Sequence, residues 1–312
     1  MDHRPDLGLT FGAIEVGMVL AVFLTGISTL QVWNYYRDYP DDSTTLKSLV
    51  GVVYTADTVH SIMLAHALYH YTIVVFGDYE ALEVLAKSSS GGILVAGLIA
   101  FAVQTFYALR VQRITKSRLI AGVCWLLALL RLVFCFCISV TVIASGRFEA
   151  FVTDSVRWQL VAMQCVGAAS DVLIAACICA GILRLRSGLT ASDKLVDKLV
   201  AFTIGSGLLT SVVAIAEIVT YVTMENFVFI TFYSIAAKLF ANSLLASLNE
   251  RNAMRRALPT WNSMQTRGQT NSQHITFHKP KPGINVELTH VPEDAEVPTS
   301  KTRDLPRDAV TV

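Results

Sequence analysis

Long apolar stretches alternate with short polar connections along most of this chain. Seven of them are long enough to cross a bilayer, whose hydrocarbon core of about 30 Å needs roughly 20 helical residues. They occupy residues 9–35, 46–75, 91–109, 119–145, 160–183, 199–223 and 227–248. Apolar residues run continuously in these stretches instead of alternating with polar ones, which favours helices over barrel strands. The pattern predicts an all-α fold, a bundle of seven transmembrane helices.

The two ends of the chain differ from this central region. We expect residues 1–8 to form a short N-terminal segment and residues 9–250 to form the membrane domain. The start of the chain lacks the features of a cleaved signal peptide, so the first apolar stretch is expected to remain as a helix. Residues 251–312 are rich in Thr, Ser, Gln, Pro and charge. Such a segment buries too little apolar surface to offset its ordering entropy, which predicts a disordered tail.

The composition supports a membrane protein. Of the 312 residues, 53% are hydrophobic and 16% are charged, with a mean hydropathy of +0.52, whereas soluble domains carry about 25% charged residues. The net charge of +1 gives no basic surface for nucleic acid. Six cysteines in a chain of this length do not form a disulfide framework. The main partner that the composition indicates is the lipid bilayer itself.

The positive charges of the connections predict an orientation. Residues 36–47, 110–118, 184–198 and 251–256 carry thirteen Lys and Arg residues, and the connections on the opposite side carry four. Because cytosolic loops are enriched in Lys and Arg, the tail is expected in the cytosol and the N-terminus outside it. The basic loops 110–118 and 184–198 suit an acidic cytosolic protein partner or lipid headgroups. We expect the plasma membrane as the location, ahead of the endomembranes.

Several short motifs together carry a resemblance. They are QVWNYYRDYP at 31–40, DTVHS at 57–61, HALYHY at 66–71, QTFYALR at 104–110, DKLVAFTIGSGLLTS at 197–211 and FYSIAAKLFANSLLASLN at 232–249. With these motifs the chain resembles, over about residues 8–251, a large family of fungal, mushroom-type seven-span membrane proteins defined by a domain of unknown function. The resemblance implies an integral membrane protein of fungal type. It implies no activity, ligand or catalytic residue.

Ionisable residues within the apolar stretches are candidates for function, because burying them in a bilayer is costly. Asp57, His60 and Ser61 lie three and four residues apart and therefore share one helix face. An aspartate next to a histidine can tie its helix to a neighbour, relay protons or contact a ligand. The stretch 199–223 carries its own polar stripe, which ends at Glu217. That stripe suits either close helix packing or the wall of a cavity.

The last apolar stretch places Ser234, Lys238 and Asn242 at steps of four. Lys238 can form an ion pair with Asp57 or Glu217, or contact an anionic ligand. A Schiff base with retinal is a further alternative for such a lysine, although the other landmarks of retinal proteins are absent. The candidate intramembrane polar site therefore comprises five residues: Asp57, His60, Glu217, Lys238 and Asn242.

Two further pairs are candidates for specific roles. Arg131 and Asp171 lie at similar depth in consecutive apolar stretches, which predicts an ion pair. His66 and His70 have the i, i+4 spacing of zinc ligands, but they lack a third ligand and a base. Interfacial packing or ligand contact is the alternative for these histidines. We expect no cofactor, no bound metal and no catalytic residue.

Three classes of function remain open on this evidence. A receptor-like sensor with a small-molecule ligand agrees with the predicted topology and the basic loops. A secondary transporter or proton-coupled carrier would use the ionisable groups at mid-depth. An intramembrane metal-dependent hydrolase would rest on His66 and His70 alone. The sensor is our first hypothesis, and an enzyme is the least favoured of the three.

Overall fold

The computed structural model describes residues 12–82, 84–184, 190–224 and 226–270, and within these ranges the side chains of 79, 190–204, 206 and 251–270 are not described. The long helices are α1 (Ala13–Asp38), α2 (Thr44–Tyr69), α4 (Lys87–Thr115), α5 (Arg118–Ser145), α6 (Asp154–Leu183), α7 (Thr190–Thr223) and α8 (Val228–Thr270). Three short elements lie between them: a π-helical turn η2 (His70–Val74), α3 (Tyr79–Leu82) and a 3-10 turn η3 (Phe148–Val152). Strands are absent from the described residues, where Val84 and Arg147 form one isolated bridge.

The helices begin and end where the sequence supplies capping residues. The side chains of Ser43 and Ser117 accept hydrogen bonds from the first turns of α2 and α5, as N-cap serines commonly do. Gly146 ends α5 with a left-handed backbone at φ +65°, a conformation that glycine adopts without strain. These caps fix the points at which α2 and α5 begin and at which α5 ends.

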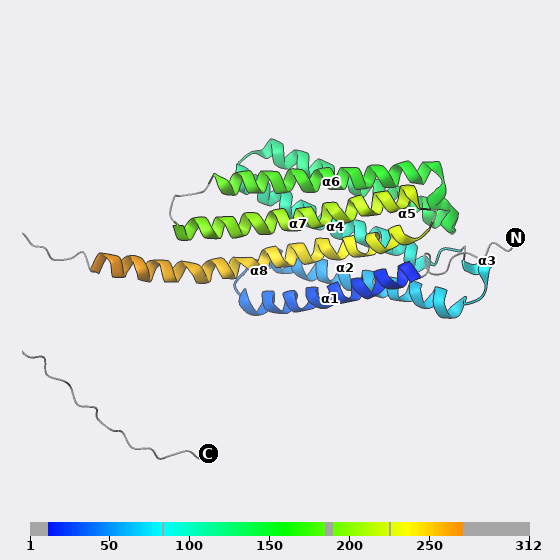
Figure 1. Cartoon of the computed structure of the whole chain (residues 1–312), viewed down its shortest axis with the longest axis horizontal. Helices are drawn as coiled ribbons and strands as arrows, with labels where there is room; N and C mark the ends of the chain where they lie inside the picture. Colours follow the sequence, from blue (N-terminus) through cyan, green and yellow to red (C-terminus); the bar gives the residue numbers. More distant parts are fainter. Residues whose placement is uncertain (1–11, 83, 185–189, 225, 271–312) are drawn as a thin grey trace, which may run out of the picture. The chain divides into compact units, whose positions relative to one another are not determined.

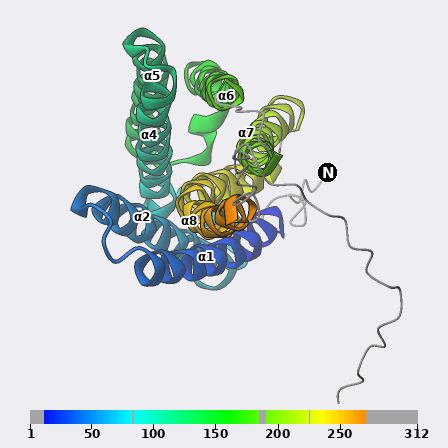
Figure 2. The ribbon, with the colours of Figure 1, turned by 90° about the vertical axis from the view of Figure 1, so that its left-hand side faces the viewer.

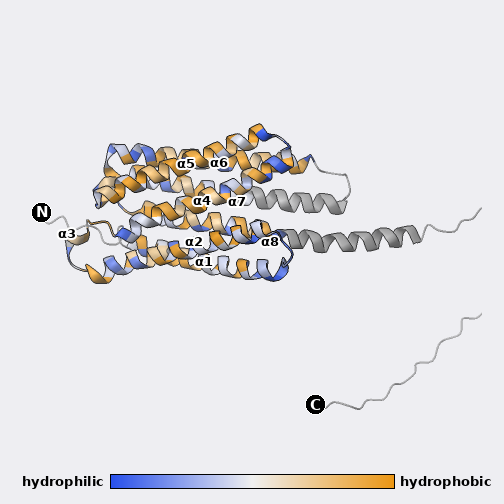
Figure 3. Cartoon of the chain, turned by 180° about the vertical axis from the view of Figure 1, so that it is seen from behind, coloured by the Kyte–Doolittle hydropathy of each residue, from blue (hydrophilic) through white to orange (hydrophobic). Residues whose placement is uncertain are grey.

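The bundle exposes apolar side chains and buries polar ones. Large apolar residues such as Phe23, Leu126 and Ile215 are more than half exposed on the outer surfaces of the helices. Asp57 and Lys238, in contrast, have no exposed surface. Figure 3 shows the hydrophobic colouring that runs along the described helices. An apolar exterior around a polar interior is what a lipid environment requires.

Six helices are long and apolar enough to cross a membrane, and each overlaps a predicted apolar stretch. They cover Ala13–Asp38, Thr44–Val74, Lys87–Thr115, Arg118–Ser145, Asp154–Leu183 and Val228–Glu250. The remaining predicted stretch, 199–223, falls on α7. Only Gly207–Thr223 of α7 is assigned as an apolar segment among the described residues, and it is shorter than a full span. The chain is therefore a multi-pass helical membrane protein, with six candidate membrane-spanning helices in its described part.

The C-terminal boundary differs from our expectation. Helix α8 continues to Thr270, so residues 251–270, which we placed in a disordered tail, are helical. Residues 250–258 (ERNAMRRAL) have high helix propensity, which favours the first part of the extension, whereas Pro259 and Gly268 further along have low propensity. Residues 271–312 of the predicted tail, and residues 1–11 at the other end, lie outside the described residues. Residues Met1–Met264 form one compact unit and Gln265–Val312 a second, of which the structure describes the end of α8.

Within the first unit, α8 lies among the other helices (Figures 1 and 2). It is joined by side-chain hydrogen bonds to α1 through Asn242, to α2 through Lys238 and to α4 through Ser243. One close approach needs a glycine: a Cβ at Gly17 of α1 would lie 2.9 Å from the backbone of Thr231 in α8. Apolar side chains of α1, α2, α4 and α8 form the largest buried cluster, around Val50, Ile99 and Leu244.

Candidate functional site: an interior polar network and an outer cavity

A buried ion pair joins α8 to α2. The Nζ atom of Lys238 lies 2.9 Å from Oδ1 of Asp57, and neither side chain is exposed. The same ammonium group donates hydrogen bonds to the backbone oxygen of Asp57 at 2.6 Å and to Oγ of Ser61 at 2.7 Å. Of the two partners that the sequence left open for Lys238, the structure therefore places Asp57 next to it. Three short contacts thus tie Lys238 to α2.

The other members of the predicted polar site lie around this pair. Asn242, one turn further along α8, donates from Nδ2 to the backbone oxygen of Leu24 in α1 at 3.1 Å. His60 is fully buried, and both of its ring nitrogens lack a hydrogen-bond partner. Its ring lies edge-on to that of Tyr233, with centroids 6.1 Å apart. The structure thus brings four of the five residues together: Asp57, His60, Lys238 and Asn242.

Glu217, the fifth residue, belongs to a second network, which lies in the first half of α6 and near the end of α7. It is 1% exposed, and its Oε2 accepts a hydrogen bond from Nε2 of Gln164. The Oε1 atom of the same glutamine lies 3.4 Å from Nη2 of Arg131. Gln164 therefore stands between a cation on α5 and a carboxylate on α7, and contacts both.

Arg131 and Asp171 do not form the direct ion pair that we expected. Within the described part of the chain, no ion pair within 4.0 Å joins them. Asp171 instead accepts a hydrogen bond at 2.9 Å from Nε2 of Gln104, while the Arg131 guanidinium lies over the ring of Phe240, 4.8 Å from its centroid. Arg131 interacts electrostatically with both Asp171 and Glu217. The direct pair is replaced because Gln104 of α4 contacts Asp171 and Gln164 of α6 contacts Arg131. The single arginine then acts electrostatically on two carboxylates.

A cavity of about 80 Å³ lies between the helices at the end of the bundle where α1 begins. All seven long helices contribute to its wall. The lining residues are Ile14, Leu64, Ala67, Tyr71, Leu85, Ser89, Gly92, Ile93, Ile138, Phe148, Phe151, Leu160, Met163, Glu217, Phe229, Ile230 and Tyr233. We call this space the outer cavity, after the side that the loop charges predict. Mostly apolar walls with a few polar groups are typical of small-molecule sites.

Aromatic residues close the end of the outer cavity. Phe148 of η3 stacks on Phe227 with ring centroids 4.6 Å apart, and Phe151 lies 6.1 Å from Phe229. The backbone nitrogen of Leu85 donates to the oxygen of Gly146 at 2.8 Å. The connection before α4 is thereby held to the connection after α5. These contacts form a defined cap over the cavity.

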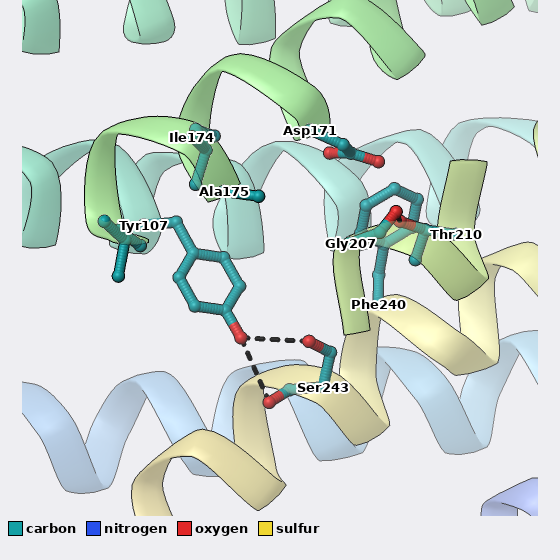
Figure 4. A pocket seen from close by; sticks show the side chains of 9 residues that line it. Tyr107, Asp171, Ile174, Ala175, Gly207, Thr210, Phe240 and Ser243 are labelled. Carbon is teal, nitrogen blue, oxygen red and sulfur yellow. Dashed lines mark hydrogen bonds between the residues drawn. The ribbon is translucent and has the colours of Figure 1, made fainter. Parts of the chain in front are cut away.

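A second, smaller cavity of about 40 Å³ is lined by residues of α4, α6, α7 and α8, four of which carry polar side chains. Figure 4 shows Tyr107 reaching towards Ser243, with Asp171 and Thr210 on the same cavity wall. The hydroxyl of Tyr107 donates to the backbone oxygen of Ser243 at 3.1 Å. A space of this size beside a carboxylate has room for a few ordered waters.

The two histidines considered as metal ligands stack on each other. The rings of His66 and His70 are nearly parallel, at 6°, with centroids 6.5 Å apart. His66 is exposed and its Nδ1 lies 2.9 Å from Oγ of Ser88. No group of three or more His, Cys, Asp or Glu side chains suited to a metal occurs among the described residues. The arrangement is that of a packed pair near the end of the bundle.

Sequence reasoning missed the two glutamines and the cap. Gln104 and Gln164 are nearly fully buried within apolar stretches, and that placement was a signal as strong as that of the charged residues. Phe148 and Phe151 lie in a connection whose short sequence gave no sign of a 3-10 turn. Their role depends on contacts with Phe227 and Phe229, which are distant from them in the sequence.

The fold and the buried polar network define the class of this molecule: it is an integral membrane protein with several helical spans. Comparison with known proteins adds one match, since residues 167–253 are similar to a family of unknown function, DUF6534. This region covers most of α6, all of α7 and the membrane part of α8, and it includes Asp171, Glu217 and Lys238. No curated protein and no solved structure matches the chain.

Proposed function

We propose that this protein is a receptor-like sensor with seven spans, of the fungal type that its sequence resembles. In this proposal α7 is the seventh span, the N-terminus lies outside the cytosol, and the protein resides in the plasma membrane. A small, largely apolar molecule binds in the outer cavity, and binding is transmitted to the basic loops on the cytosolic side. A cytosolic protein would bind to the loops in a way that depends on whether the cavity is occupied.

The observation that carries the proposal is the outer cavity itself. Every long helix contributes to its wall, so an occupant touches all the elements whose relative positions would have to change. Its wall residue Glu217 connects through Gln164 to Arg131 at the centre of α5. The opposite end of α5 begins at the basic loop, where Arg113, Lys116 and Arg118 are exposed. A physical path therefore runs from the cavity to the loop.

A transporter is the second candidate, because the charged side chains of Lys238 and Asp57 are buried in the interior. A transporter would move protons or ions by breaking and remaking the pair of Lys238 and Asp57, and mid-depth ionisable groups are common in transporters. The three contacts that hold Lys238 to α2 favour a permanent structural role for that pair. We therefore rank the sensor first.

A fluorescence measurement tests the sensor. An environment-sensitive fluorescent amino acid would replace Leu119, which is 79% exposed at the start of α5, in protein held in lipid nanodiscs. Hexanol, benzyl alcohol, hexylamine and benzylamine would then be added. We expect at least one of them to change the emission, because occupancy of the outer cavity shifts α5.

Two alanines on the same helix supply the matched variants. Ala67 lines the outer cavity and is 4% exposed, whereas Ala65 faces outwards. Ala67→Phe should fill the cavity and abolish the response, and Ala65→Phe should preserve it. If the emission does not change and one of the added molecules accumulates inside proteoliposomes, the sensor hypothesis is wrong and the transporter hypothesis takes its place. A response that survives Ala67→Phe would place sensing elsewhere.

A further inference from the structure

The described interior holds one more acidic side chain than basic ones. Between the helices and away from their ends, Lys238 pairs with Asp57. Arg131 is then the one described cation that acts on both Asp171 and Glu217. We count His60 as neutral, because both ring nitrogens are buried without a partner and an unsolvated charge there would be costly. Two carboxylates therefore share one positive charge.

The two carboxylates differ in their surroundings. Asp171 is hydrogen-bonded to Gln104 and to Thr210, and it lies against the smaller cavity, whose wall also carries the hydroxyls of Tyr107 and Ser243. Glu217 is part of the wall of the outer cavity, whose other lining is mainly apolar. Among the described side chains, Gln164 is the one that donates a hydrogen bond to it. The less well-compensated carboxylate is therefore Glu217, and its free side borders the outer cavity.

The chemistry of the wall selects the kind of cation. A metal ion would require several oxygen or nitrogen ligands, and the described residues form no such group. An organic ammonium group needs only one carboxylate for a charge-assisted hydrogen bond, and its carbon body would lie against the apolar wall. The volume of about 80 Å³ is below the range of about 300–1,000 Å³ for drug-sized ligands, so the body must be compact.

We propose that the outer cavity binds a small amine with an apolar body, whose ammonium group donates a hydrogen bond to Glu217. This inference rests on the proposed sensor function and specifies the chemistry of its ligand. The amine supplies the positive charge that the interior lacks. Selectivity for amines over uncharged molecules of the same shape then arises from Glu217, while the apolar wall sets the size.

Benzylamine and benzyl alcohol provide a matched pair of probes, because they share a shape and differ in charge at pH 7. Their binding to the full chain in lipid nanodiscs would be measured by titration calorimetry, with empty nanodiscs subtracted. We expect benzylamine to bind at least about tenfold more tightly, since charge-assisted hydrogen bonds are roughly twice as strong as neutral ones. Binding of both probes should be lost in Ala67→Phe and retained in Ala65→Phe.

Two carboxylate variants identify the group responsible. Glu217→Gln keeps the size of the side chain and an acceptor for Gln164, and should bring the ratio of the two affinities to about one. Glu149→Gln, at an exposed carboxylate of η3 whose side chain is 73% exposed, should leave the ratio unchanged. If Glu217→Gln does not fold, equal affinities of the two probes in the unmodified protein would still overturn the proposal.

The outcomes separate the ligand class from the function. Equal binding of both probes, abolished by Ala67→Phe, would overturn the amine proposal and leave the cavity as a site for uncharged molecules. In that case a proton on Glu217 balances the charge. Absence of binding by either probe would overturn the amine proposal together with the small-molecule cavity. A preference for benzylamine that persists in Glu217→Gln would also overturn it, because another group would then select the charge.

Discussion

Lys238→Met is expected to destabilise the protein by about 3–5 kcal/mol, the usual cost of removing one partner from a buried ion pair. The change leaves the Asp57 carboxylate at 0% exposure without its cation. It also removes the ammonium donor from the Asp57 backbone oxygen and from Ser61. Methionine retains most of the aliphatic stem, so lost packing contributes little.

The thermal unfolding midpoint measures this effect. Cys124 and Cys135 are buried free thiols, and a thiol-reactive dye reports the temperature at which they become exposed. The double variant Asp57→Asn/Lys238→Met removes both charges and should recover most of the loss. Ser61→Ala, which deletes a single neutral contact to the ammonium, should cost only about 1 kcal/mol. An unchanged midpoint for Lys238→Met alone would show that the pair does not hold α8 to α2.

Arg131→Met is expected to have an effect at least as large, because Arg131 is the described cation for two carboxylates. Its loss leaves Asp171 with its neutral partners Gln104 and Thr210, and Glu217 with Gln164, so neither carboxylate keeps a described cation. Removing the compensating charge of one buried carboxylate costs about 3–5 kcal/mol. We therefore expect little folded protein at ordinary growth temperature. Yield after size-exclusion chromatography in mild detergent is the measurement.

Charge removal at both carboxylates supplies the control. In the triple variant Arg131→Met/Asp171→Asn/Glu217→Gln, no buried charge is left without a partner at this site, so the yield should largely return. Gly167→Ala tests the same guanidinium independently, because a Cβ at Gly167 would lie 2.9 Å from its Cζ atom, whereas Gly122 has open space. Gly167→Ala should therefore lower the midpoint more than Gly122→Ala. A triple variant as poor as Arg131→Met would attribute the loss to packing rather than to charge.

The positions of the helices were predictable from the sequence because the bilayer imposes a length on each span. The six candidate spans overlap the predicted stretches, and the serine caps start α2 and α5 two residues and one residue earlier than predicted. The end of α8 was not predictable in the same way. Residues 251–270 are mainly polar, so hydropathy favoured a tail, and only the segment up to Leu258 has a helix propensity that favours continuation of α8.

The pairing of the buried charges was predictable only in part. Depth along each helix placed Asp57 and Lys238 at a similar level, and it did the same for Arg131 and Asp171. The rotation of each helix about its axis and its packing angle decide which side chains meet. Neither quantity can be derived from the pattern of a single sequence. For Arg131, two glutamines from other helices changed the outcome. Polar uncharged residues in apolar stretches therefore carry as much information as the charged ones.

The outer cavity could not be predicted from local patterns. Its wall takes one to three residues from each of seven helices and from two connections. Most of these residues are ordinary apolar residues that any span contains. Glu217 was the exception, since an ionisable group at the end of a polar stripe suggested a cavity wall. The sequence thus indicated one residue of the site, and the assembly of the helices supplied the remainder.

The most direct test of the account is electron cryo-microscopy of the full chain in lipid nanodiscs containing benzylamine. The account predicts that α7 crosses the bilayer as the seventh span. It also predicts density for the amine in the outer cavity, with its nitrogen within hydrogen-bonding distance of Glu217. A cavity filled by protein side chains, or α7 lying outside the bilayer, would contradict both the seven-span sensor and its ligand site.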